Sequence, residues 1–227
     1  MRKEIRRRRD AQVRANGVCT EHRDVFDVTP GGAKVRTALA TQVTEVDRLL
    51  AFQQRCIEER RAATADIRRA HATIVQTART IVRVGRLIDL PDAPMRTLQL
   101  PVRMAHDDLL AYARGLLDRV LPHADTFIAE GLPADALTQL TNAIARLTSA
   151  RAAQATARQQ FSGAFELIHE AQETATRTIA ALEAIALSTA DAPHELVTKL
   201  RIAKRVRPRS AVAAAGGPMS STSGSAD

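Results

Sequence analysis

Two long stretches of the chain repeat apolar residues every seven positions, the spacing typical of long amphipathic helices that pack together. The first stretch covers about 33–88 and the second about 134–187. In both, the repeated positions are apolar near the two ends and polar in the middle. A continuous helix over the first stretch would be roughly 85 Å long at 1.5 Å per residue. We therefore expect an all-α protein built on two long helices.

Clusters of Pro and Gly divide the remaining sequence into shorter elements, because both residues interrupt regular helices. The expected order is a polar helix over 2–14 closed by Asn16-Gly17, a break at 29–32, the first long helix, an extended connector over 89–102, a helix over 105–121 kinked at Pro122 and continued over 123–130, a turn at 131–133, the second long helix, and a last helix from about 193 to 206. Short turns between helices favour antiparallel neighbours.

This pattern predicts an elongated antiparallel helical bundle with two long helices, a kinked shorter helix and short terminal helices. We expect a basic N-terminal helix and linker over 1–28, a helical bundle domain over 29–206, and a disordered tail over 207–227 that is rich in Pro, Ala, Gly and Ser. The expected core comprises Leu39, Val43, Val46, Leu50, Ile67, Ile74, Ile81, Leu116, Leu117, Val120, Phe127, Leu140, Ile144, Leu147, Phe161, Phe165, Ile168, Ile179 and Leu182.

The formal net charge of +8 comes from the two ends of the chain. Residues 1–14 hold seven Lys or Arg against two acidic residues, and 199–227 hold six against Asp227 alone. Such basic segments could neutralise the phosphates of nucleic acid, although the chain has too few aromatic residues to favour stacking on single strands. The candidate nucleic-acid contacts are Arg6, Arg7, Arg8, Arg9, Lys204, Arg205, Arg207 and Arg209.

The polar middle of the two long helices is a second candidate site. If the helices pair antiparallel, their polar positions come level and form what we call the polar waist: Gln53, Arg60, His71, Arg151, Gln154 and Arg158. A buried polar layer of this kind can set the register of paired helices. It could equally be a hydrated stretch, and the local excess of Arg over acidic residues favours partial exposure.

No pattern of residues indicates catalysis, and we expect neither an enzyme nor a cofactor. Glu166 and His169 match the Glu-x-x-His pair of di-iron bundles, but no second such pair is placed to complete the site. His106-Asp107-Asp108 is explained by the preference for acidic residues in a first helical turn. Phosphate-binding glycine loops and nucleophile elbows are absent. A metal enzyme is therefore only the third hypothesis.

Four segments together resemble an uncharacterised group of helical proteins from high-GC bacteria. They are His22 to Phe26 before the first long helix, the connector ending in Leu100-Pro101, the 127–133 segment FIAEGLP, and the 195–206 stretch that closes on Lys204-Arg205-Val206. The group has no assigned activity. The resemblance thus implies a bacterial helical bundle and no functional residue.

The function that these patterns favour is a non-catalytic structural or protein-interaction module with a protein partner or self-association. The alternative is a nucleic-acid-associated accessory protein that binds through its basic termini. The chain shows no signal peptide and no apolar run long enough for a membrane span. Its two cysteines, Cys19 and Cys56, have no pattern that demands a disulfide, so we expect a cytoplasmic protein with free thiols.

Overall fold

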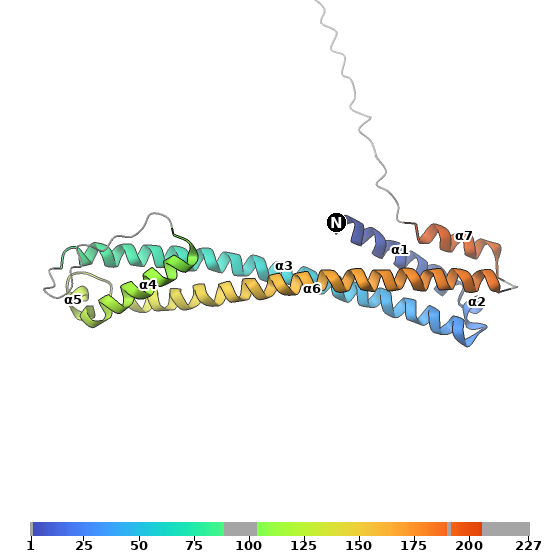
Figure 1. The fold of residues 1–227 in the computed structure, drawn as a ribbon, viewed down its shortest axis with the longest axis horizontal. Helices are drawn as coiled ribbons and strands as arrows, with labels where there is room; N and C mark the ends of the chain where they lie inside the picture. Colours follow the sequence, from blue (N-terminus) through green and yellow to red (C-terminus); the bar gives the residue numbers. More distant parts are fainter. Residues whose placement is uncertain (1, 89–103, 190–191, 206–227) are drawn as a thin grey trace, which may run out of the picture. The chain divides into compact units, whose positions relative to one another are not determined.

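The fold was analysed in a computed structural model that describes residues 2–88, 104–189 and 192–205. Nearly all of these residues are helical and none forms a strand, which confirms the all-α fold with two long helices. The elements in chain order are α1 (Arg2–Glu21), α2 (Arg23–Asp27), α3 (Pro30–Gly85), α4 (His106–Val120), the 3-10 helix η2 (Leu121–His123), α5 (Ala124–Ala129), α6 (Ala136–Ser188) and α7 (His194–Ala203) (Figure 1). Within the described ranges, no helix combines the length and the apolarity that crossing a membrane would need.

Contacts divide the chain into two compact units, and α3 and α6 contribute to both. Unit 1 takes in Met1–Arg48 and Leu167–Asp227, and unit 2 takes in Leu49–Glu166. Ala15, Cys19 and Phe26, which come from the predicted N-terminal segment 1–28, are part of the core of unit 1. The expected tail over 207–227 and the expected connector over 89–102 lie outside the described residues.

Helix α1 is longer than the sequence predicts, because it passes through Asn16-Gly17 and ends at Glu21. The prediction of a helix end there was wrong. Ala15 and Cys19 lie one turn apart on the buried face and are both 0% exposed, so a helix that stopped at Gly17 would lose this packing. A glycine inside a helix costs only about 1 kcal/mol relative to alanine, which the apolar contacts outweigh.

Two buried glutamines join α1 to α6 within unit 1. The Gln12 side chain donates from Nε2 to the Gln172 carbonyl oxygen at 2.9 Å, and Gln172 Nε2 donates to the Ile5 carbonyl oxygen at 2.8 Å. Both side chains are almost completely buried. Because a buried amide that loses its partner is costly, these bonds favour a single register of α1 along α6.

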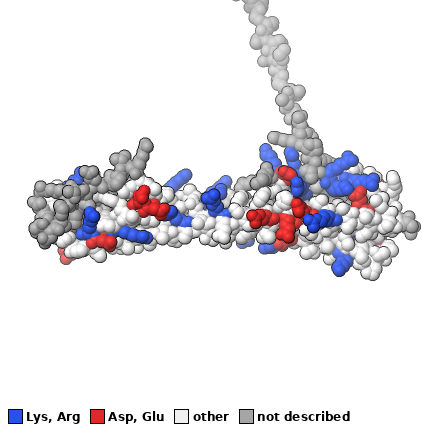
Figure 2. Space-filling view, in the orientation of Figure 1, with Lys and Arg blue, Asp and Glu red and all other residues white. Residues whose placement is uncertain are grey.

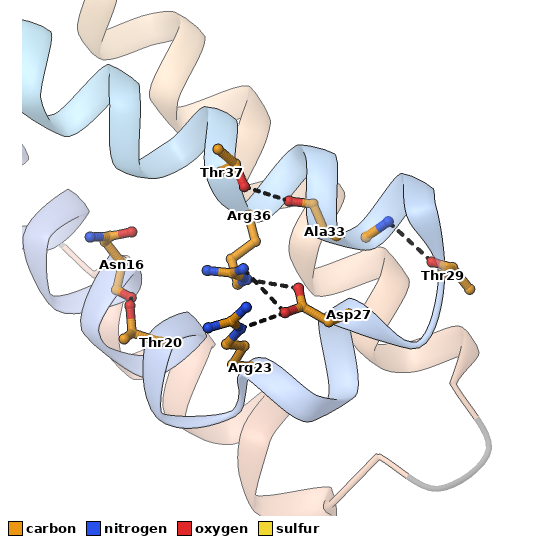
Figure 3. Close-up of polar contacts among 9 residues, drawn as sticks. Asn16, Thr20, Arg23, Asp27, Thr29, Ala33, Arg36 and Thr37 are labelled. Carbon is orange, nitrogen blue, oxygen red and sulfur yellow. Dashed lines mark hydrogen bonds and ion pairs between the residues drawn. The ribbon is translucent and has the colours of Figure 1, made fainter.

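The link between α2 and α3 is held by polar contacts (Figure 3). The Asp27 carboxylate accepts hydrogen bonds from Arg23 and Arg36 at 2.6 and 3.0 Å, and these hold its pKa below the usual range. The backbone N–H of Gly32 donates to Thr29 Oγ1 at 3.1 Å, which caps the start of α3. Glycine is required there, because a Cβ would lie 2.2 Å from a backbone oxygen of α2. The expected break at 29–32 was therefore wrong for residues 30–32, which form the first turn of α3, and the interruption is confined to residues 28 and 29.

In unit 2, α3 and α6 run antiparallel and α4 covers one face of the pair (Figure 1). The large apolar stripes predicted from the sequence point to this face and form the core with α4. Four residues of the expected core are only half-buried in the structure: Leu50, Leu117, Phe161 and Phe165.

Both long helices carry a second buried row, which consists of small residues. Each of its members lies three residues after a position of one of the apolar stripes. On α3 it includes Cys56, Ala63 and Ala70, and on α6 it consists of Ala136, Ala143, Ala150, Ala157 and Ala164. We call these the alanine rows. Small side chains at a helix contact allow the two helix axes to approach closely.

The expected kink at Pro122 lies within η2, and η2 and α5 together close the end of unit 2. Phe127 is completely buried in the core of unit 2, whereas its neighbour Ile128 is 40% exposed. Of these two adjacent apolar residues, only Phe127 faces the core. The expected turn is present, with Gly131 at a φ of 97° that favours glycine.

Candidate functional site

Unit 2 carries an open groove along the face of α3 and α6 that α4 does not cover. Its floor is formed by two pairs of buried alanines, Ala63 and Ala70 from α3 and Ala143 and Ala150 from α6. The groove has a volume of about 830 Å³. The small size of these alanines has two consequences: it leaves room for the groove, and it lets the two helices pack closely.

The rim of the groove is charged, with two residues of each sign. Glu59, Asp66 and Arg69 come from α3, and Arg146 comes from α6. Asp66 and Arg69 form an ion pair at 2.6 Å with side chains that are 53% and 78% exposed. Glu59 and Arg146 are exposed and form no ion pair with any residue of the described ranges. The rim thus presents charges of both signs that solvent or a partner can reach.

The polar waist has a mixed environment. Gln53 is buried, whereas Arg158 is exposed. Gln154 lies between these extremes and donates from Nε2 to Thr64 Oγ1 at 2.8 Å. Arg60 is also exposed, and its guanidinium lies 5.9 Å from the centre of the Phe161 ring. The structure therefore places one waist residue in the interior and leaves the others in contact with solvent to different degrees.

The remaining waist residues, His71 and Arg151, contact the start of α4. The rings of His71 and His106 meet edge to face, with centres 5.4 Å apart. Arg151 forms a bidentate ion pair with Asp107, which holds the pKa of that carboxyl below its usual range. Because α4 begins at this level, the equivalent positions nearer the middle of α3 and α6 have no α4 residue to pack against. Polar residues at those positions are the expected consequence.

The candidate basic residues of α1 are partly committed to contacts within unit 1. Arg9 donates to Asp47 from Nε at 2.7 Å and from a terminal nitrogen at 3.0 Å, and these bonds raise its pKa. Arg8 pairs with Glu4 at 2.7 Å. Arg6 is exposed and Arg7 is half-buried, and neither forms an ion pair with a described residue. Only these two are available from the predicted arginine run.

The basic residues at the end of α7 are similarly divided. Lys204 and Arg201 both contact the Glu183 carboxylate, the latter at 2.8 Å, and hold its pKa below the usual range. Arg205 is exposed, and its carbonyl accepts a hydrogen bond from Arg14 at 3.1 Å. Figure 2 shows Lys and Arg side chains gathered over α1 and the end of α7. The candidate residues Arg207 and Arg209 lie outside the described residues.

The Glu183 contacts predict a stability difference that depends on pH. The Glu183 side chain is only 13% exposed, but its two partners are partly solvated, so we expect Glu183→Gln to lower the free energy of unfolding by about 1 kcal/mol at pH 7. A lowered pKa in the folded state stabilises the protein above the unfolded value, about 4.3 for Glu, and this contribution disappears as the pH falls through the folded value.

Urea unfolding of the wild type and Glu183→Gln at pH 7 and below pH 4 measures this difference, which should shrink towards zero in acid. Glu173→Gln is the control, because Glu173 is 49% exposed in its pairs with His169 and Arg177. A difference for Glu183→Gln that stays constant between the two pH values would show that the ion pairs are not its cause.

The described residues contain no group of three or more side chains arranged to hold a metal ion. His169 Nδ1 lies 3.3 Å from Glu173 Oε1, and Asp107 is occupied by Arg151. Both cysteines are free and buried. Burial raises the pKa of Cys19 to about 11 and also raises that of Cys56, which keeps the thiols protonated. None of these side chains is placed as an activated nucleophile.

The groove is a site that the sequence analysis above does not predict. The α6 side of its floor could have been predicted from the alanines that recur every seven residues at 136, 143, 150, 157 and 164. Because alanine is only weakly hydrophobic, a pattern of large apolar residues does not include them. Comparison with known proteins gives no relative from which a site could be transferred: no family model, no curated protein and no solved structure matches the chain.

Proposed function

We propose that the protein is a non-catalytic structural or protein-interaction module that binds through the open groove of unit 2. The observation that carries the proposal is a groove of about 830 Å³ between two packed helices, with a floor of alanine and a charged rim. Helices commonly recognise each other through such grooves, into which a ridge of side chains from a partner fits. The proposed location is the cytoplasm, where the free thiols of Cys19 and Cys56 would persist.

The test is to fill the groove without disturbing the fold. Ala62 and Ala153 line the groove and are exposed, so Ala62→Trp and Ala153→Trp should leave stability unchanged while blocking a partner helix. The expected result is a loss of at least about tenfold in the affinity of self-association or of partner binding. Sedimentation velocity and size-exclusion chromatography with light scattering measure self-association, and affinity capture measures partner binding.

Two matched substitutions serve as controls. Ala65→Trp and Ala152→Trp introduce the same side chain on the same helices at exposed positions that do not line the groove. They should behave like the wild type. Equal loss of binding in all four variants, or a wild-type protein that stays monomeric and captures no partner, would contradict the proposal.

A second function, association with nucleic acid, is supported by cations in α1 and just after α7 that solvent can reach. Arg6, Arg7 and Arg205 form no ion pair with a described residue, and Figure 2 shows basic side chains gathered over α1 and the end of α7. We expect duplex binding that weakens steeply with salt. Arg6→Ala with Arg7→Ala should reduce it, whereas Arg9→Ala should chiefly reduce stability, because Arg9 is bound to Asp47. Salt-independent binding would argue against this function.

A further inference from the structure

We infer that the groove of unit 2 binds the same groove of a second copy of the chain, so that the two copies are related by a twofold axis. The inference rests on the proposed function and names its partner. It follows from the symmetry of the groove lining and from the order of the charges along the rim, two features that a self-complementary surface requires.

The two walls of the groove are equivalent in the heptad pattern. If the large apolar stripe residues Ile67 and Leu140 are assigned position a, the lining residues of both α3 and α6 fall at positions c, d and g. Both helices place alanine at d and polar or small residues at c and g. A surface made of two equivalent walls can accept the walls of a second copy, and two helices from each copy would then form a four-helix arrangement.

The charges of the rim are ordered along the groove. Thr64 and Gln154 are hydrogen bonded across the helix pair, and the helices are antiparallel, so positions after Thr64 are level with positions before Gln154. Arg146 lies about two turns from this level and Arg69 about one and a half turns on the same side. Along the groove the order is therefore Glu59, Asp66, Arg69 and Arg146, with acidic residues in one half and basic residues in the other.

A second copy turned by a twofold axis near the centre of the groove would bring its basic half over the acidic half of the first copy. Such an axis places α3 of one copy opposite α3 of the other, so Asp66 would face Arg69 of the second copy. The same pair repeats on the other side of the axis, and the acidic half of each rim lies opposite the basic half of the other. Charge complementarity of this type selects a partner and an orientation more than it adds affinity.

The strength of the contact should be modest. The groove extends over Glu59 to Thr73 on α3, a length of roughly 20 Å at 1.5 Å per residue, and its floor is alanine rather than large apolar residues. Contacts of this extent fall at the small end of specific interfaces. We expect a dissociation constant on the order of 10 µM, so the dimer should form and dissociate with concentration.

The experiment uses two charge-reversed variants of the full chain. Glu59→Arg with Asp66→Arg makes the rim wholly basic, and Arg69→Glu with Arg146→Glu makes it wholly acidic. Each variant alone should self-associate at least about tenfold more weakly than the wild type, because like charges would face each other. An equimolar mixture should form a 1:1 heterodimer, since the opposite charges again face each other. Sedimentation velocity over a range of concentrations measures the association of the wild type, of each variant and of the mixture. Circular dichroism verifies that the variants fold.

Matched controls change the same net charge elsewhere in unit 2. Glu58→Arg with Glu166→Arg adds the same positive charge, and Arg61→Glu with Arg68→Glu adds the same negative charge, at exposed positions that do not line the groove. These control variants should dimerise like the wild type, which separates a specific contact from general repulsion.

Three results would overturn the inference in distinguishable ways. The wild type could be monomeric at about 500 µM and yet bind a different protein, with that binding blocked by Ala62→Trp. The proposed function would then stand, and the inference that the partner is a second copy would be wrong. If the wild type dimerises and both charge-reversed variants dimerise equally well, self-association uses another surface. If the wild type neither self-associates nor binds any partner, the proposed function fails together with the inference.

Discussion

Replacing Phe127 by alanine is expected to lower the free energy of unfolding by about 3–5 kcal/mol, the range for removing a buried aromatic ring from a packed core. Phe127 belongs to α5, is 0% exposed, and lies in the core formed by α3, α4 and α6 in unit 2. The loss has two parts. The favourable free energy of transferring the ring from water to the interior is lost. In addition, the neighbouring side chains collapse only partly into the space that remains.

The neighbouring residue is the control for this prediction. Ile128 is 40% exposed, so Ile128→Ala should cost about 1 kcal/mol or less. Urea unfolding followed by far-ultraviolet circular dichroism measures both variants, and the midpoint should move much further for Phe127→Ala. Equal effects of the two substitutions would mean that α5 does not close the core of unit 2 in the way described.

The contrast between Phe127 and Ile128 shows where sequence-based reasoning about this fold stops. The long helices, the Pro122 kink and the turn at Gly131 follow from local signals, namely heptad spacing and the conformational preferences of Pro and Gly. Which of two adjacent apolar residues is buried depends on how a short helix docks. Similarly, the continuation of α1 through Gly17 depends on tertiary contacts of Ala15 and Cys19, which no local pattern contains.

The candidate sites divide in the same way. The polar positions of the waist are evident in the sequence, but their environment depends on where α4 begins, at the level of His71 and Arg151. Net charge identifies the basic ends, whereas the fixing of Arg9 by Asp47 joins residues 38 positions apart. The groove depends on small residues. A search for large apolar side chains passes over these, although they determine how closely two helices approach.

Enlarging a residue of the alanine rows is expected to be the second most damaging change. Ala157 is 2% exposed and lies outside the groove, so Ala157→Leu adds three carbon atoms at a closely packed position without altering the proposed docking surface. Overpacking of this kind costs about 1–3 kcal/mol, because helices or side chains must move to admit the larger group. Leucine and alanine differ little in helix propensity, so the cost reports packing rather than the stability of the helix itself.

The matched control is Ala155→Leu, which makes the identical substitution two residues earlier at an exposed position of α6. Its effect should stay within about 0.5 kcal/mol. Thermal and urea unfolding of both variants distinguish the two ways in which α6 could pack. If the alanine rows lie where two helices approach closely, only Ala157→Leu lowers stability. If Ala157→Leu instead stabilises the protein, the rows border unfilled space that a larger side chain can occupy, and the groove floor would then owe its depth to missing volume rather than to close helix packing.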